Sequence, residues 1–463
     1  MFRGFIFGLA VYAMAGGAMA GSSPSNDEIM SIIKQRVDEK RASGIVVGVL
    51  DADGKNRVVA YGDPGPGAKP LGAKSVFEIG SVTKTFTATL LADMVVRGEV
   101  KLEDPVQKYE HPGVTVPSRN GKQIELVNLA MQDSGLPRLP TNLAPKDMTN
   151  PYADYTVDML HGFLNSYQLP RDPGEKYEYS NLGGGLLGHV LAYKAGTDYE
   201  ALVKARILKP LHMDMSGIAL SPDMTAWLAK GHTATGALAP NWDIPTLAGA
   251  GALRSNAEDM LKFMAANIHP PKDDLGRAMA LAQAPRRVVD GGIPQAKNEI
   301  GLIWMTVTGK GGGKIVWHNG ETGGYHSFIG FDPKTKKGVV VLANSAGSID
   351  DIGFHLIVDA IPLTPAPPPP REHKEVAVSA DTLKRYVGEY QFAPTFAITI
   401  RLSGNQLTEQ ATGQPEAPIY PESETDFFLK VVDAQISFVV EDGKVTGLIL
   451  HQNGRDLKAN KVK

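Results

Sequence analysis

The sequence predicts an α+β fold, in which an antiparallel sheet is assembled from both ends of a large domain and a helical lobe is inserted between them. Strand patterns occupy residues 44–63 and return from residue 299 onward. Long helical patterns fill the stretch between. A Pro-rich segment at 362–373 then separates this domain from a small all-β module at the C-terminal end.

The length and composition set the first limits on function. A chain of 463 residues exceeds what one core of ordinary size holds, so we expect one large and one smaller domain. The formal net charge is −3 and no basic block stands out, so we expect no nucleic-acid partner. Because the chain has no cysteine, disulfides, thiol catalysis and thiolate metal sites are excluded.

Residues 1–20 have the pattern of a signal peptide. Arg3 precedes an apolar stretch that ends in the small-residue pattern Ala-Met-Ala at 18–20. The apolar run is shorter than the roughly 20 residues that a membrane-spanning helix needs. We therefore expect cleavage near Gly21, a mature chain without a transmembrane span, and a periplasmic or secreted bacterial protein.

The first predicted elements are a helix and a hairpin. Ser25 and Glu28 have the spacing of a capping box, and apolar residues follow at helical intervals as far as Val37. Two β-branched runs within 44–63, joined by Asp-Ala-Asp-Gly, predict a β-hairpin.

The middle of the large domain is predicted to be helical and its end to be β. Helical patterns cover 83–100 and 183–208. The later strand patterns lie at 299–309, 314–320, 325–333 and 337–345. The sequence GKGGGK at 309–314 lacks the Ser/Thr and following helix of a phosphate-binding loop, so we interpret it as a hairpin turn.

The Pro-rich segment defines the predicted domain boundaries. A run of prolines can join neither a helix nor the interior of a sheet, and it forms a stiff, extended spacer. The segments beyond it alternate apolar and polar residues between Gly-containing turns. We therefore predict a signal peptide at 1–20, a catalytic domain at 21–361, a linker at 362–373 and a β-barrel-like domain at 374–463.

The stretch FEIGSVTKTF, residues 77–86, places Ser81 and Lys84 three residues apart at the start of a buried helix, where they share one face. A hydroxyl is a weak nucleophile, and an amine kept neutral by desolvation can help to remove its proton. The helix N-terminus also offers free N–H groups to a developing oxyanion. A second Ser-x-x-Lys, Ser31 to Lys34, lies in the N-terminal amphipathic helix, where we expect a solvated helix face.

Two further motifs could supply partners for Ser81. The only Tyr-x-Asn in the chain, Tyr179 to Asn181, offers a phenol as general base and an amide that binds an acyl carbonyl or positions Lys84. His318-Asn319-Gly320 lies at the end of a strand, where the glycine would let a substrate backbone lie close to the sheet edge. Taken alone, each motif is more typical of an ordinary turn.

Together and in this order, the three motifs resemble those of the serine penicillin-recognising superfamily. FEIGSVTK is very similar to the active-site stretch of class C β-lactamases and of their D,D-peptidase, D-aminopeptidase and esterase relatives. The resemblance covers residues 26 to about 359 and includes the stretches DSGLPRLP, RDPGEKYEYSNLGGGLLG, GAGALRSNAEDMLKF and GVVVLANS. It implies a β-lactamase-like fold for the large domain.

The resemblance also implies roles for single residues. The nucleophile, lysine and tyrosine of the family fall on Ser81, Lys84 and Tyr179. The implied substrate-binding positions are Asn181, His318, Asn319, Gly320 and Glu321. In the family, the oxyanion hole consists of the backbone N–H of the nucleophile and one just after the third motif, here that of Glu321. The implied reaction is acyl transfer through a covalent Ser81 ester followed by hydrolysis, without a cofactor.

Two features depart from the pattern of class C β-lactamases. The third motif begins with His318 where those enzymes have Lys-Thr-Gly, and a histidine carries a positive charge only when protonated. This departure disfavours efficient β-lactam hydrolysis. The appended β module is the second departure, and it resembles the lipocalin-like tails of some peptidase and esterase relatives.

The sequence gives little support for other kinds of catalytic or metal-binding site. The chain has no Gly-x-Ser-x-Gly elbow and no His pair four residues apart with a Glu, so we expect no metal site. His326 follows the third motif and is conceivable as a base for Ser81, but a structural or pocket-wall role is the better expectation. Four aromatic residues are candidates for lining the cleft or for packing in the core: Tyr152, Tyr155, Trp227 and Trp242.

The sequence thus predicts an exported serine hydrolase acting on D-amino-acyl peptides or β-lactams. One alternative keeps the chemistry and changes the substrate, giving a carboxylesterase of small acyl esters. Another is a penicillin-binding sensor that acylates slowly and uses the β module to hold a partner. The sequence leaves the oligomeric state open.

Overall fold

The computed structural model describes residues 24–290, 293, 296–366, 373–393, 396–412, 416–430, 434–452 and 455–462. The described chain forms two compact units, which divide between Pro365 and Ala366. The expected signal peptide and the part of the Pro-rich segment at 367–372 lie outside the described residues. Within the described part, every helix is too short or too polar to cross a bilayer.

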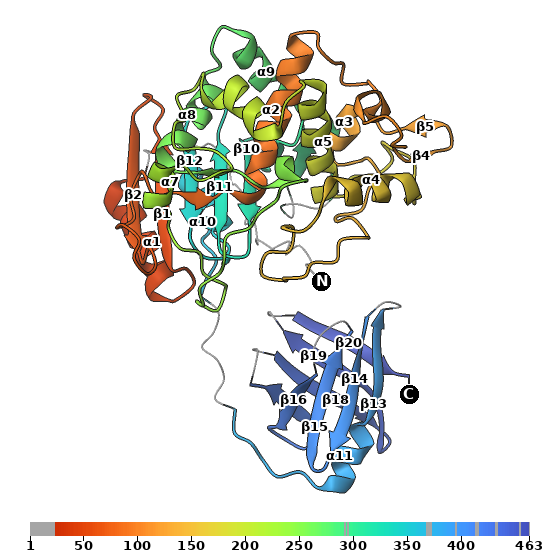
Figure 1. Ribbon diagram of the computed structural model, residues 1–463. Helices are drawn as coiled ribbons and strands as arrows, with labels where there is room; N and C mark the ends of the chain where they lie inside the picture. The colour runs from red at the N-terminus through yellow and green to blue at the C-terminus, as the bar shows by residue number, and fades with distance from the viewer. Residues whose placement is uncertain are drawn as a thin grey trace. The chain divides into compact units, whose positions relative to one another are not determined.

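An eight-stranded antiparallel sheet forms the centre of the first unit (Figure 1). Its strands lie in the order β2 (Asn56–Gly62), β1 (Gly44–Leu50), β12 (Gly338–Ala343), β11 (His326–Phe331), β10 (Lys314–Glu321), β9 (Met305–Thr308), β8 (Lys297–Ile300) and β7 (Arg287–Val288). Strand β1 pairs with β12, so that Ile45 lies opposite Ala343. The sheet is therefore assembled from both ends of the unit, as predicted.

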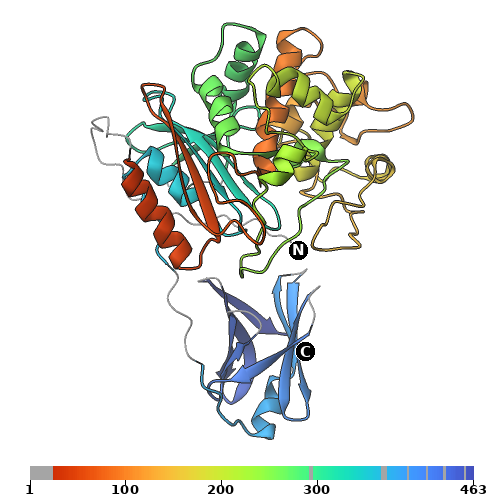
Figure 2. The same ribbon diagram turned by 60° about the vertical axis from the view of Figure 1, so that its left-hand side comes forward.

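Helices cover both faces of this sheet (Figure 2). On one face, α1 (Asn26–Asp38) and α10 (Asp350–Ile357) share a hydrophobic core with β1 and β12. The predicted capping box of α1 is present, because Ser25 accepts from the N–H of Glu28 while the Glu28 carboxylate accepts from the N–H of Ser25. On the other face, α8 (Ala257–Ile268) lies against β1, β11 and β12, and the helical lobe packs beyond it.

The lobe contains most of the remaining described helices and short strands of this unit. They are α2 (Thr83–Val96), η2 (Val106–Tyr109), β4 (Ser118–Arg119), β5 (Lys122–Gln123), α3 (Leu126–Ala130), α4 (Val157–Ser166), α5 (Asn181–Lys194), α6 (Tyr199–Val203), η3 (Lys204–Leu208), α7 (Pro222–Ala226), η4 (Ala248–Ala250) and α9 (Asp274–Gln283). The pattern over 183–208 is not one helix. It breaks after Lys194, because Gly196 has a φ of 68° and Asp198 caps the next helix by accepting from the N–H of Ala201.

Helix α2 is buried on all sides, and its sequence combines apolar residues with threonines and the buried ionisable residues Lys84 and Asp93. Every residue from 83 to 94 is buried. The chain enters α2 from β3 (Phe77–Glu78), which pairs with β6 (Arg254–Ser255), through the 3₁₀ turn η1 (Gly80–Val82). This turn contacts β10 and β11, so the start of α2 lies where the lobe meets the sheet.

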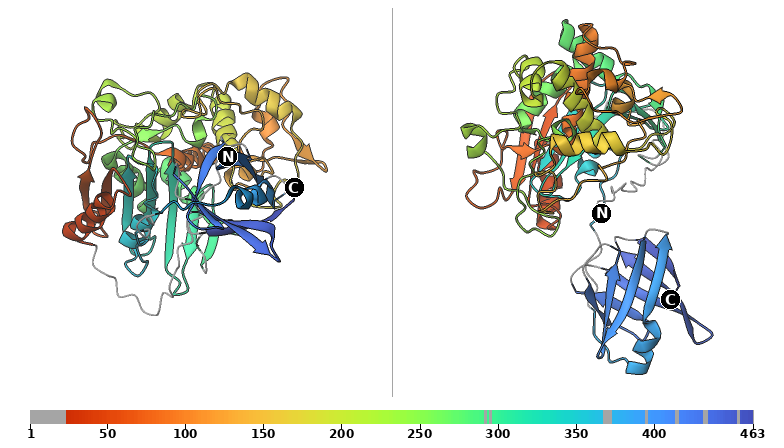
Figure 3. Two further views of the ribbon diagram at one scale, coloured as in Figure 1. Left: turned by 90° about the horizontal axis from the view of Figure 1, so that it is seen from below. Right: turned by 45° about the vertical axis from the view of Figure 1, so that its right-hand side comes forward.

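The second unit is a closed eight-stranded barrel with helix α11 (Ala380–Tyr386) at one end (Figure 3). Its strands are β13 (Gly388–Ala393), β14 (Phe396–Ser403), β15 (Gln406–Ala411), β16 (Ala417–Pro421), β17 (Asp426–Leu429), β18 (Ala434–Glu441), β19 (Lys444–Gln452) and β20 (Arg455–Lys461). Tyr386 of α11 and Tyr390, Ile436 and Leu448 of the barrel share a separate core. The predicted barrel-like module is confirmed.

Candidate active site

Ser81 and Lys84 meet where η1 passes into α2. Ser81 lies in the 3₁₀ turn and is partly exposed, whereas Lys84 lies in the first turn of α2 and is completely buried. The Nζ atom of Lys84 is 2.9 Å from the Oγ atom of Ser81. The spacing of three residues therefore brings the hydroxyl and the amine into hydrogen-bonding contact, as the sequence predicted.

Two carbonyl groups complete the surroundings of the Lys84 amine. Its Nζ donates to Asn181 Oδ1 at 2.9 Å and to the backbone oxygen of Ala250 at 2.6 Å. Burial, reinforced by the charge of Arg138, holds the pKa of Lys84 well below its ordinary value. A neutral amine has two N–H groups, which the two carbonyls accept, and one lone pair, which then faces the Ser81 hydroxyl. This arrangement fits an amine that takes the serine proton.

Tyr179 approaches the same hydroxyl from the other side. Its phenol donates to Ser81 Oγ at 2.8 Å. Burial raises the pKa of Tyr179 above its ordinary value, and the hydrogen bond to Ser81 opposes this shift only in part. The phenol is therefore protonated at neutral pH in the free protein. This favours Lys84 over the Tyr179 phenol as the base in this state.

Helix α5 positions Asn181 against Lys84. The helix is capped by Ser180, whose hydroxyl accepts from the N–H of Gly183, so Asn181 stands at its first position. Gly184 allows the helix to come close, because a Cβ atom there would lie 2.9 Å from Cε of Lys84. The glycine-rich start of α5 thus makes room for the buried lysine.

Strand β10 brings Gly320 against the turn η1, which carries Ser81. A Cβ atom at Gly320 would lie 2.1 Å from the backbone oxygen of Ile79 and 2.7 Å from the backbone nitrogen of Ser81. Gly80 has a φ of 48°, and a Cβ there would meet the backbone nitrogen of Glu321 at 2.6 Å. Gly320 therefore makes space for the turn that carries Ser81, in addition to any space for a substrate backbone. The close contact also makes the backbones at Ser81 and Glu321 neighbours.

His318 shares the face of β10 that carries Gly320. Its ring is almost completely buried, and Nδ1 lies 2.6 Å from the backbone oxygen of Asn319. Burial is the main cause that lowers the pKa of His318 to about 4. The ring is therefore neutral at neutral pH and offers no positive charge to a substrate carboxylate.

The side chain of Asn319 lies on the opposite face of the strand. Its amide donates to Asp350 Oδ2 at 2.6 Å, and His326 Nε2 lies 3.0 Å from Oδ1 of the same carboxylate. The structural interpretation of His326 is confirmed, because the ring binds the first residue of α10. Glu321 ends β10 with an exposed side chain, so its backbone is the part that lies near Ser81.

Arg138 near the site was missed as a functional candidate, whereas Tyr152 and Trp242 were among the aromatic residues expected in the cleft or the core. The guanidinium carbon of Arg138 lies 5.1 Å from the centroid of the Tyr179 ring, and the backbone oxygen of Arg138 accepts from the N–H of Asn181. The phenol of Tyr152 accepts from Asn181 Nδ2 at 3.2 Å, with Trp242 packed against its ring at a centroid distance of 5.5 Å. The stretch DSGLPRLP pointed to Arg138 only as framework, since one arginine in a loop has no distinctive spacing.

The second Ser-x-x-Lys lies elsewhere, on α1. The side chain of Lys34 is about half exposed, and its Nζ donates to Asp38 at 2.6 Å and to the hydroxyl of Tyr61. Ser31 is exposed. This pair is an ordinary solvated helix face, as expected.

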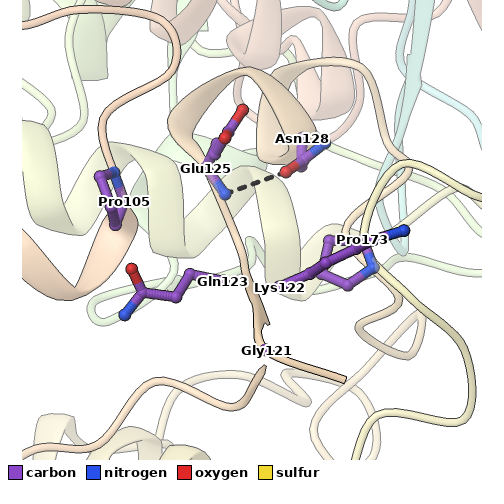
Figure 4. A pocket seen from close by; sticks show the side chains of 7 residues that line it. All are labelled: Pro105, Gly121, Lys122, Gln123, Glu125, Asn128 and Pro173. Carbon is purple, nitrogen blue, oxygen red and sulfur yellow. Dashed lines mark hydrogen bonds between the residues drawn. The ribbon is translucent and has the colours of Figure 1, made fainter. Parts of the chain in front are cut away.

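A pocket of about 350 Å³ opens beside α3, and none of the residues around Ser81 lines it (Figure 4). The N–H of Glu125 donates to Asn128 Oδ1 at 2.9 Å at its rim. Its lining residues are Pro105, Gly121, Lys122, Gln123, Glu125, Asn128 and Pro173. The pocket brings together no nucleophile and base, so it is not the candidate active site.

Comparison with known sequences covers nearly the whole described chain. Residues 29–361 match the family model described as Beta-lactamase, and residues 372–461 match a domain of unknown function, DUF3471. Over 313 residues the chain is 30% identical to the D-alanyl-D-alanine-carboxypeptidase/endopeptidase AmpH of Escherichia coli strain K12, covering 65% of this chain and 79% of the relative. A β-lactamase of the same strain is 27% identical over 383 residues, covering 74% of this chain and 95% of the relative.

Solved structures agree with this family and with the fold. A β-lactamase/D-alanine carboxypeptidase from Yersinia pestis, complexed with citrate, has a TM-score of 0.63 at 25% identity, covering 73% of this chain and 99% of that chain. A class C β-lactamase has a TM-score of 0.61 at 22% identity, covering 74% of this chain and 98% of that chain. The resemblance and the fold class inferred from the motifs are both confirmed.

Proposed function

Because the chain belongs to the β-lactamase family, we propose that this serine hydrolase uses Ser81 to take up the acyl group of D-amino-acyl peptides or β-lactams. The observation that carries the proposal is the arrangement of the Lys84 amine. It lies 2.9 Å from the Ser81 hydroxyl, its two N–H groups have carbonyl acceptors, and burial lowers its pKa. These conditions activate a serine at neutral pH.

Acylation then proceeds by proton transfer and substitution at the acyl carbon. Lys84 takes the Ser81 proton as Oγ forms a bond to the carbonyl carbon of the substrate. The bond from this carbon to nitrogen breaks, and the leaving nitrogen receives the proton from Lys84 through the hydrogen-bonded hydroxyl of Tyr179. Water subsequently attacks the Ser81 ester and releases the acid. We assign Tyr179 to proton transfer and Asn181 to positioning Lys84 and binding the acyl side chain.

The negative charge on the carbonyl oxygen needs donors that are already in place. The backbone N–H groups of Ser81 and Glu321 lie on neighbouring segments held together at Gly80 and Gly320. Such fixed donors stabilise the transition state because they need no reorganisation during the reaction. We propose that these two groups form the oxyanion hole.

The choice of substrate depends on what binds an acidic group. The guanidinium carbon of Arg138 lies 5.1 Å from the centroid of the Tyr179 ring, and we propose that this side chain attracts the substrate carboxylate. His318 is neutral at neutral pH and adds no charge. This neutrality favours a second candidate, a carboxylesterase of small uncharged acyl esters, because such a substrate needs no cation in the site.

The domain organisation forms part of the proposal. We propose that residues 21–361 carry catalysis, that 362–373 serve as a spacer and that 374–463 form an independent module. The division of the described chain between Pro365 and Ala366 supports this assignment. The Arg3 and Ala-Met-Ala pattern supports export to the periplasm or the medium after cleavage of residues 1–20.

The first test is the mass of the intact protein after brief exposure to a penicillin, with Ser81→Ala and Ser31→Ala as paired variants. We expect an adduct on the wild type and on Ser31→Ala but not on Ser81→Ala. An adduct that persists indicates slow deacylation, typical of a peptidase or sensor, whereas unmodified protein with hydrolysed drug indicates a β-lactamase. Unmodified protein with intact drug favours the esterase, and equal loss in both variants refutes Ser81 as the nucleophile.

A further inference from the structure

Four potential metal ligands meet in the helical lobe, outside the Ser81 site. Glu110 and His111 directly follow η2, His161 lies on α4 and His189 lies on α5. Figure 1 shows α4 and α5 side by side in the lobe. One nitrogen of each histidine and one carboxylate oxygen of Glu110 all lie within 4.8 Å of one another.

Three histidine nitrogens of this cluster are buried and lack hydrogen-bond partners in the described chain. They are His111 Nδ1, His161 Nε2 and His189 Nε2, and Glu110 Oε1 likewise has no partner. The other carboxylate oxygen, Glu110 Oε2, accepts from the backbone N–H of His111 at 3.0 Å. It lies 3.6 Å from His111 Nδ1 and 3.8 Å from His161 Nε2, which is too far for a hydrogen bond. The unpartnered histidine nitrogens thus gather around the Glu110 carboxylate without hydrogen-bonding to it.

Burial makes this arrangement costly without a cation. The side chain of Glu110 is completely buried, and its ion-pair partners among the described residues are only His111 and His161. These imidazoles balance the carboxylate charge only when they are protonated, and a buried carboxylate that lacks a cationic partner is destabilising. A divalent ion at the centre would neutralise this charge and would bind the three imidazole nitrogens at the same time.

We propose that Glu110, His111, His161 and His189 bind a divalent transition-metal ion, with Zn²⁺ as the preferred occupant. Three imidazoles and one carboxylate suit zinc, whereas calcium and magnesium require oxygen ligands. Tetrahedral zinc with bonds of 2.0–2.1 Å places its donors roughly 3.4 Å apart, so the cluster needs only a small contraction to close.

Four protein ligands leave no open position, which is typical of a structural site. The ion would join the end of η2 to α4 and α5. Helix α5 carries Asn181 at its first position and His189 roughly two turns later. The site would therefore hold in place the helix that positions Lys84, without contacting the reacting groups.

A search for local motifs could not find these ligands. The expectation of no metal site rested on the absence of histidines at close spacing, and here the three histidines are separated by 50 and by 28 residues. Only the fold brings them together. The ring of Tyr193, one turn after His189, packs on His111 at a centroid distance of 3.8 Å and holds that ligand in place.

Zinc binding by the full chain, carrying no histidine tag, tests the proposal. The protein is stripped with a chelator, dialysed against Zn²⁺ and assayed for bound metal and thermal unfolding. The variants are Glu110→Gln, which keeps the side-chain shape, and His161→Ala. The control is His269→Ala, because His269 is exposed at the end of α8.

We expect one Zn²⁺ per chain and an increase in Tm on adding Zn²⁺ for the wild type and for His269→Ala. Glu110→Gln and His161→Ala should lose both the bound Zn²⁺ and the increase in Tm. Acylation by a penicillin shows whether each variant is folded. If His161→Ala is not folded, the metal content of Glu110→Gln alone decides whether the site binds Zn²⁺. The proposal is overturned if the wild type binds no Zn²⁺, or if Glu110→Gln binds it with unchanged stoichiometry and affinity.

Discussion

Lys84 has two carbonyl acceptors, Asn181 Oδ1 and Ala250 O, and one hydroxyl neighbour, Ser81. Neither acceptor carries a charge that would hold the amine protonated. Because burial also lowers the pKa of Lys84, the free protein keeps a lone pair directed at the serine. The chemistry of the site thus depends on how one amine is surrounded.

The pH dependence of acylation should reflect this pKa. The acylation rate should fall as the pH decreases through the pKa of Lys84, because protonation removes the lone pair of the amine. The pH at which this fall occurs should lie well below the ordinary pKa of a lysine. Stopped-flow acylation by a penicillin across the pH range measures it. Lys84→Met should reduce acylation by about 10²–10⁴-fold. A wild-type rate that still rises between pH 10 and 11 would contradict a lowered pKa.

Arg138 and His318 should differ in their effect on charged substrates. Arg138→Ala should raise KM for a substrate with a free carboxylate by about tenfold or more, because a charged hydrogen bond contributes roughly 1.5–3 kcal/mol. KM for a neutral ester should change little. His318→Gln should leave the preference for the carboxylate unchanged at pH 7, since the wild-type ring is already neutral above about pH 4. Steady-state kinetics with matched acid and ester substrates decide between these outcomes.

The sequence predicted the candidate catalytic residues but not all of their surroundings. Ser81, Lys84, Tyr179 and Asn181 belong to motifs with fixed spacing, and the structure brings all four together. The motif His318-Asn319-Gly320 did not by itself reveal the direction of the Asn319 side chain. That direction depends on the alternation of side chains along β10. The group of Ala250 that accepts the hydrogen bond from Lys84 is a backbone oxygen. Every residue has such an oxygen, so the residue type at position 250 could not identify it.

At the scale of elements, the site depends on the close approach of a turn to a strand. Strand β10 can run against η1 only because Gly320 has no side chain and Gly80 adopts a left-handed conformation. The strand and the buried helix α2 were predictable from their patterns. The break after α5 was not, because Gly196 and Asp198 interrupt a helical pattern that remains apolar on both sides.

A methyl group at position 320 should separate the turn from the strand. Gly320→Ala should lower the free energy of unfolding by about 1–3 kcal/mol and reduce the acylation rate, because the added atom overlaps backbone groups that cannot rotate away. Gly313→Ala is the control, since nothing lies within 4 Å of a Cβ atom there. Denaturant unfolding and penicillin acylation measure both effects. Equal behaviour of the two variants would show that the contact is unimportant.

At the scale of the whole molecule, the described chain has separate hydrophobic cores for its two units. Residues of α11 and the barrel make up one core, whereas the sheet and the lobe make up the others. The Pro-rich segment predicted such a division in the sequence. The closure of the barrel was less evident, because alternation indicates strands without fixing which edges pair.

A chain that ends at Pro365 should therefore retain its activity. We expect its acylation rate by a penicillin to stay within twofold of the full-length value, since no residue of the Ser81 cluster belongs to the barrel. Calorimetry of the full chain should show a second unfolding transition that the shortened chain lacks. A large loss of acylation in a shortened chain that is still folded would assign the barrel a part in catalysis.

The pairing of β1 with β12 also has a consequence for biosynthesis. The hairpin of β1 and β2 is made early, but its partner strand, residues 338–343, leaves the ribosome only after nearly 300 further residues. Contacts so distant in sequence form late. The nascent chain thus cannot complete its central sheet until residues 338–343 have been translated.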